Sequence, residues 1–107
     1  MDRGAWRTLL TLYGQEVTLK EASGGKTVRA FFQPVRENGP GESPTRLGKA
    51  PEGKWLYLGP AEEDLEQVRS LVWAGREFEL LRRRDYQLGT ETLYHWALCR
   101  EMDEVAE

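Results

Sequence analysis

The sequence alternates apolar and polar residues over several short segments, and this period of two constrains the fold more than any other feature. The alternation first appears on both sides of the turn-forming stretch Ser-Gly-Gly-Lys at 23–26. Its apolar positions are Val17, Leu19, Val28, Ala30 and Phe32. We therefore predict a β-hairpin over 15–35, whose second strand ends at Pro34 because proline cannot donate to a sheet.

Further strands are predicted after residue 53. The stretch 54–60 is apolar on both faces and closes on Gly-Pro, as in a central strand. Phe78 and Leu80 alternate with glutamates in a strand that leaves the core before Arg82, and the last strand covers 92–99.

Two segments have a helical pattern. Apolar side chains recur every three or four residues near the N-terminus, between a possible cap at Asp2 and a stop at Gly14, which predicts a short amphipathic helix; the same composition also permits a strand. Residues 61–67 begin with acidic residues typical of a helix N-terminus, which predicts a short helix or helical turn. The pattern does not decide between helix and strand over 68–73.

The segment 36–53 interrupts this pattern. Its 18 residues include 4 Gly, 3 Pro and one large aliphatic residue, Leu47, so we predict a long exposed loop. Two interpretations stay open: an insertion without a role in the isolated chain, or a segment that packs against a partner.

The chain has 107 residues, enough for one modest core and hence a single domain, 1–107. The fold class that fits is mainly β: a small antiparallel β-barrel or sandwich of five to six strands, with a short N-terminal helix and one long Gly/Pro-rich loop. Along the chain we expect an N-terminal helical segment at 1–14, the hairpin at 15–35, the loop at 36–53, the remaining barrel strands at 54–100 and an acidic tail at 101–107.

The content of reactive residues argues against an enzyme. One cysteine, Cys99, and one histidine, His95, exclude an internal disulfide and a Cys/His zinc cluster within one chain. On a strand these two residues would lie about 13 Å apart, too far for a thiol–imidazole pair. We predict no catalytic residues, no cofactor and no metal site. With no apolar run of the roughly 18 residues that a spanning helix needs and no signal peptide, we also expect a soluble protein without membrane contact.

Charge and aromatic content point to protein partners. Residues 1–53 carry a net charge of +2 and residues 54–107 one of −5, a split suited to docking a positive end on a negative one. Four Trp and four Tyr exceed what so small a core easily hides, and aromatic and arginine side chains are typical interface anchors. The predicted interface residues are Trp6, Tyr13, Arg46, Leu47, Lys49, Trp73, Arg82, Arg83 and Arg84. An alternative is a small β-barrel that binds nucleic acid through Arg82–Arg84 and surface aromatics.

The order of segments resembles a known family. The strand Trp55-Leu56-Tyr57-Leu58-Gly59-Pro60, the segment Gly75-Arg76-Glu77-Phe78-Glu79-Leu80, and the strands around them are similar to the small head-tail connector proteins of tailed bacteriophages and prophages. These are the head-closure, stopper or head-tail joining proteins. The resemblance covers Gln15 to Arg100 and rests on strand order rather than on an invariant motif.

The resemblance implies a non-enzymatic virion structural protein of the head-tail junction, or neck. It implies a β-barrel subunit that forms a homo-oligomeric ring of six or twelve copies between portal and tail. Its partners would be portal or adaptor proteins and tail proteins, with non-specific contact to DNA in the channel. It would act in the host bacterial cytoplasm during assembly and then in the virion neck.

Overall fold

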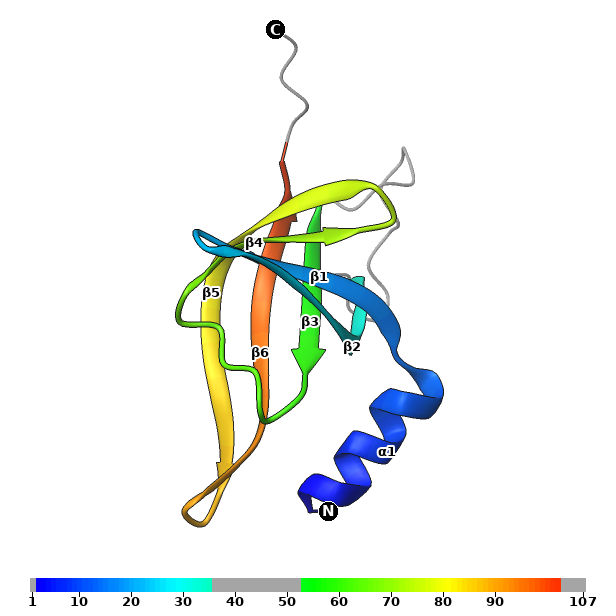
Figure 1. Ribbon diagram of the computed structural model, residues 1–107, viewed down its shortest axis with the longest axis vertical. Coiled ribbons are helices and arrows are strands. Elements are labelled where there is room, and N and C mark those ends of the chain that lie inside the picture. Colours follow the sequence, from blue (N-terminus) through cyan, green and yellow to red (C-terminus); the bar gives the residue numbers. More distant parts are fainter. Residues whose placement is uncertain (1, 36–52, 103–107) are drawn as a thin grey trace, which may run out of the picture.

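The chain folds into a closed antiparallel β-barrel with one helix at its N-terminus, as the computed structural model shows for residues 2–35 and 53–102 (Figure 1). Its elements are α1 (Arg3–Tyr13), β1 (Gln15–Glu21), β2 (Gly24–Pro34), β3 (Lys54–Gly59), β4 (Val68–Trp73), β5 (Arg76–Leu88) and β6 (Glu91–Glu101). The strand order is β1-β2-β3-β6-β5-β4, and β4 pairs with β1 to close the wall. The mainly β fold is thus confirmed, and of the two predicted architectures it is the barrel.

The barrel interior holds the main core. Alternate residues of every strand point inward, as the period of two requires. The fully covered side chains include Val17, Leu19, Phe32, Tyr57, Leu71, Phe78 and Cys99. Gly59 has to be glycine here, because the Tyr57 ring, two residues earlier on the same face, occupies the place of a Cβ atom.

The N-terminal segment forms the predicted helix and not a strand. The Asp2 carboxylate caps it by accepting a hydrogen bond from the Ala5 amide at 2.8 Å. Trp6 and Leu10 are buried against the barrel, and the Trp6 indole donates to the Gly59 carbonyl at 3.0 Å. The helix therefore packs where β3 ends, at the lower end of the barrel in Figure 1.

Two local predictions were wrong in part. The β1–β2 turn is Ala22–Ser23, one step before the predicted stretch, since Gly24 and Gly25 already pair with β1. Of the helix or helical turn predicted at 61–67, no helix forms: the segment has two single turns, in which the Glu63 amide donates to the Pro60 carbonyl and the Val68 amide to the Leu65 carbonyl. The Asp64 carboxylate accepts from the Glu66 amide, a local hydrogen bond that competes with helix formation. Leu65 points into the core.

Strands β2 and β3 are neighbours although many residues separate them. Pro34 is opposite Trp55, and the Val35 amide donates to the Lys54 carbonyl at 2.9 Å. The ends of the connecting stretch are therefore already joined by strand pairing. The predicted loop at 36–53 lies, except for Gly53, outside the described residues, and so does most of the predicted tail.

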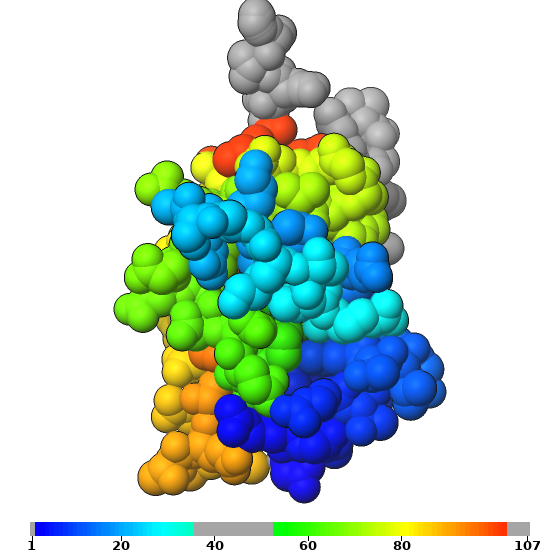
Figure 2. All heavy atoms as spheres, in the orientation of Figure 1, coloured from blue at the N-terminus to red at the C-terminus, as the bar shows by residue number. Residues whose placement is uncertain are grey.

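Strands β5 and β6 extend beyond the barrel. Strand β5 pairs with β4 only from Arg76 to Glu79, whereas its pairing with β6 continues to Leu88. The free part forms a two-stranded arm that projects below β3 in Figure 1 and lies beside α1 in Figure 2. Arg82, predicted to begin a run that follows the strand, is instead in the middle of β5.

Candidate interaction surface

The outer face of the sheet carries two rows of paired side chains that run across four strands. Their neighbours in sequence, such as Tyr57 and Ala97, are buried in the barrel, so the rows face outward. One row is Gln33, Leu56, Leu98 and Arg82, and the next is Phe31, Leu58, Trp96 and Arg84. Each row is thus apolar over β3 and β6 and ends on an arginine of β5.

The helix covers only one end of these rows. The Trp6 ring packs at 5.6 Å from Phe31 and 5.1 Å from Tyr94, and Leu58 belongs to the same cluster. The remaining apolar side chains, Leu56, Trp96 and Leu98, lie outside this cluster and stay partly exposed. An apolar strip on the sheet is therefore left without a cover from the part of the chain that the structure describes.

Arginines and tyrosines border the strip on the arm. The Arg84 guanidinium lies 5.9 Å from the Trp96 ring centre, within cation–π range. Tyr86, 46% exposed, stacks on Tyr94 at 5.1 Å with nearly parallel rings. We call this surface the arginine–aromatic face. It consists of Leu56, Arg82, Arg84, Tyr86, Trp96 and Leu98.

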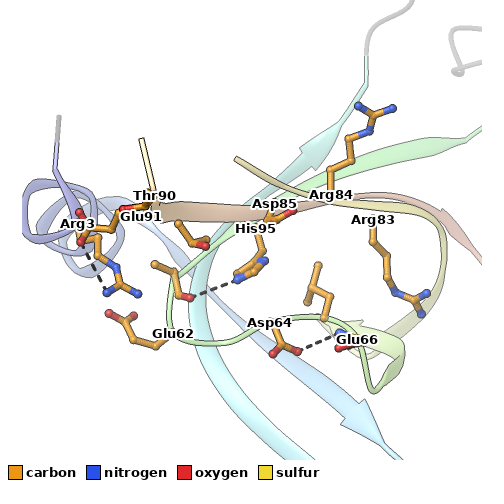
Figure 3. Close-up of a pocket in the computed structure, with 13 residues that line it drawn as sticks. Arg3, Glu62, Asp64, Glu66, Arg83, Arg84, Asp85, Thr90, Glu91 and His95 are labelled. Atoms are coloured by element: carbon orange, nitrogen blue, oxygen red, sulfur yellow. Dashed lines mark hydrogen bonds and ion pairs between the residues drawn. The ribbon is translucent and has the colours of Figure 1, made fainter. Parts of the chain in front are cut away.

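On the other side of the arm lies a hollow of about 810 Å³, between the segment after β3 and strands β5 and β6 (Figure 3). Figure 3 shows Arg83 pointing toward this segment and Arg84 pointing away from it, as expected for consecutive residues of a strand. Five carboxylates and three arginines, Arg3, Arg83 and Arg84, line it, although the Arg84 guanidinium itself points away toward Trp96. We call it the acidic hollow, defined by Glu62, Asp64, Glu66, Asp85 and Glu91.

The polar groups of the hollow are only partly paired. Burial is the largest single influence on the pKa of the Glu62 carboxyl and raises it, but the bond from the Arg7 guanidinium and the smaller effects of backbone hydrogen bonding and nearby arginines together lower that pKa below its ordinary value. The Arg83 guanidinium donates to the Val68 carbonyl at 2.7 Å and so makes no ion pair with the acids. Asp64 and Glu66 form no ion pair with any residue of 2–35 or 53–102. The hollow thus keeps unneutralised negative charge.

The predicted interface residues fall into different places. Trp6 is only 8% exposed and is used inside the chain, so it offers little surface to a partner, whereas Tyr13 is 67% exposed at the end of α1. Trp73 lies half-buried at the far end of the barrel, where Arg76 covers its ring at 5.8 Å. Two members of the predicted basic run, Arg82 and Arg84, join the arginine–aromatic face, and Arg83 points to the hollow. Arg46, Leu47 and Lys49 lie outside the described residues.

His95 and Cys99 do not meet in a reactive pair. The thiol of Cys99 is buried in the core, which raises its pKa to about 12 and keeps it protonated. The His95 ring lies 3.2 Å from the Ala61 carbonyl at the base of the hollow. Within residues 2–35 and 53–102, no three His, Cys, Asp or Glu side chains are grouped as metal ligands would be.

Sequence reasoning missed Leu56 and Leu98 as surface residues. The signal was present: the stretch 54–60 and the last strand are apolar on both faces, and two such strands side by side need cover on the outside as well as the inside. What the sequence does not show is that β3 and β6 are neighbours, because this pairing joins strands far apart along the chain.

Comparison with known proteins adds no relative: no family model matches the sequence, and no curated protein or solved structure matches it. Within residues 2–35 and 53–102, no helix has both the length and the apolar character that a membrane span needs.

Proposed function

We propose that this protein is a non-enzymatic structural subunit of the tailed-phage neck, which forms a ring that joins or closes the portal and connects to the tail. The observation that carries the proposal is the partly exposed apolar strip of Leu56, Trp96 and Leu98 beside the projecting arm. Apolar residues bordered by arginines and tyrosines are typical of protein interfaces. That the assembly is a ring in the phage neck is proposed from the resemblance in strand order.

The experiment is to locate the chain in assembled particles. Tailed particles from a bacterium that carries the gene are purified and labelled with gold-tagged antibodies against this protein. We expect label at a single place, the junction of head and tail, and peptides of the chain in the particle proteome. Particles that lack the protein, or that carry it on the head or along the tail, would contradict the proposal.

A second candidate, nucleic-acid binding, is favoured by the stacking of Arg84 on Trp96 and of Tyr86 on Tyr94 on one open face. Fluorescence anisotropy with short single-stranded and duplex DNA over a salt series tests it. Tight binding by the monomer that weakens steeply with salt would favour this candidate over the ring subunit.

A further inference from the structure

We infer that the arginine–aromatic face of one copy docks onto the acidic hollow of a second copy of this chain, and that this contact repeats head to tail. The inference rests on the proposed function as a ring subunit, and it names the partner and the residues that make the contact. Arg82 and Arg84 of one copy would pair with Asp64 and Glu66 of the next.

The two surfaces lie on opposite sides of the same two-stranded arm. Arg84 is opposite Trp96 and points outward, whereas Asp85 is opposite His95 and lines the hollow. Figure 3 shows the consequence, because Arg84 extends away from the side on which Asp64 and Glu66 lie. The arm is one sheet thick: Arg82 and Arg84 lie on its outer side, and its other side, which carries Arg83 and Asp85, faces the acids of the 61–67 segment.

The four charged side chains of the inferred contact are not held in ion pairs, although Asp64 accepts from the Glu66 amide and Arg84 lies over Trp96. Arg82 and Arg84 make no ion pair with any described residue, and neither do Asp64 and Glu66. All four residues are exposed. A guanidinium can bind a carboxylate through two parallel hydrogen bonds, and the two arginines of one copy match the two acids of the next in number.

The same distribution of charge favours a head-to-tail contact over a twofold dimer. A twofold dimer through the arginine–aromatic face would place Arg82 and Arg84 against their own copies, and a dimer through the hollow would oppose its acids. A contact between unlike surfaces pairs opposite charges, and because the face and the hollow lie on opposite sides of the arm, each copy meets a different neighbour on each side. Such a contact passes from copy to copy in one direction and closes into a ring or continues as a stack.

A polyanion fits the arginine–aromatic face less well than a second copy does. The strip contains the aliphatic side chains of Leu56 and Leu98, which offer nothing to phosphates. The carboxylates of the hollow lie one sheet thickness away, so they would repel a nucleic acid. We therefore take the second copy as the occupant.

The test uses paired charge reversals in the full chain. The first variant is Arg82→Glu with Arg84→Glu, and the second is Asp64→Arg with Glu66→Arg. Matched controls are Arg69→Glu and Glu16→Arg, which reverse exposed charges on β4 and β1 outside both surfaces. Sedimentation velocity measures self-association, and circular dichroism checks that every variant keeps the barrel.

We expect each double variant to lose at least tenfold in self-association and each control to behave as the wild type. An equimolar mixture of the two double variants should regain association, since the reversed face of one then matches the reversed hollow of the other. Association that survives either reversal, or a loss that mixing does not restore, would overturn the inference. Association that nuclease treatment abolishes would also overturn it and favour nucleic acid.

The outcome is separable from that of the proposed function. A wild-type chain that stays monomeric up to about 1 mM, which corresponds to less than roughly 4 kcal/mol of binding free energy, overturns the head-to-tail contact. Gold label at the head-tail junction would then still support a neck protein whose contacts are with other chains.

Discussion

Trp6 holds α1 on the barrel through both its ring and its indole nitrogen. It packs against Phe31 and Tyr94 and donates a hydrogen bond to the Gly59 carbonyl. We predict that Trp6→Ala lowers the free energy of unfolding by about 3 kcal/mol, as large-to-small changes at buried aromatic sites do. Urea denaturation followed by circular dichroism measures it.

The matched control for this change is Tyr13→Ala on the same helix. Tyr13 is 67% exposed, so its loss should change the free energy of unfolding by no more than about 0.5 kcal/mol. Equal effects of the two substitutions would show that α1 is not fixed by Trp6.

Glu77 makes the barrel sensitive to acid. The Ser70 hydroxyl donates to its carboxylate at 2.6 Å and, with Lys20, lowers its pKa below the ordinary 4.5, against a smaller effect of burial. The Arg76 guanidinium likewise lowers the pKa of Glu101. Because both folded-state pKa values lie below the unfolded ones, their contribution to stability is present above about pH 4.5 and is lost as the pH falls through the folded values.

We therefore expect the free energy of unfolding to decrease from pH 6 to pH 3, and Glu77→Gln to reduce that decrease. At pH 6 the variant should be less stable by about 1 kcal/mol, a value that already allows for solvent screening of a partly exposed carboxylate. Denaturant titrations at several pH values give both quantities. An identical pH profile for variant and wild type would contradict this assignment.

At the scale of elements, the β2–β3 connection is separable from the barrel. The Val35 amide already bonds the Lys54 carbonyl, so a two-residue Asn-Gly turn in place of 36–53 can join the strands. We predict that this replacement leaves the free energy of unfolding unchanged or raises it by up to about 2 kcal/mol, because a shorter loop costs less entropy to close. Thermal and urea denaturation would measure it.

The control replaces the same stretch by an 18-residue Gly-Ser linker, which keeps its length and removes its side chains. If the native stretch contacts a partner, both replacements should fold and neither should enter phage particles. A replacement that fails to fold would show that 36–53 contributes to the core after all.

How much of the fold can be predicted from the sequence also depends on the element. The hairpin at 15–35 follows from alternation and a local turn, and α1 follows from Asp2, Gly14 and apolar spacing, so local physics suffices for both. The segment 61–67 could not be predicted, because Ala61 and Leu65 are held by the core and its acids bind Arg7 and Lys26 far away in sequence. The candidate surface needed the register between β3 and β6, which no local pattern contains.

The edge of β5 shows how the arm avoids unwanted pairing. Bulges interrupt its ladder with β6 near Leu81 and near Tyr86, and three arginines lie between them. Charges and bulges on an edge strand disfavour the addition of another strand. The arm is thus suited to contacts through its two faces rather than through its edge.

For the whole molecule, the inferred contact between copies makes assembly dependent on ionic strength. Raising the salt from about 50 to 500 mM shortens the screening length severalfold, so the dissociation constant for self-association should rise by about tenfold. Sedimentation velocity over a salt series tests this. Association that strengthens or stays constant with salt would indicate a contact dominated by apolar area.

The hydrogen bond between Val35 and Lys54 has a consequence for how such a protein can evolve. Strands β2 and β3 pair with each other up to the residues that border 36–52, so we expect insertions, deletions and changes of composition there to be nearly neutral for folding. Natural selection can then adapt this stretch to a new neighbour without altering the strands. Among descendants of this chain we expect the barrel to persist while this stretch diverges first.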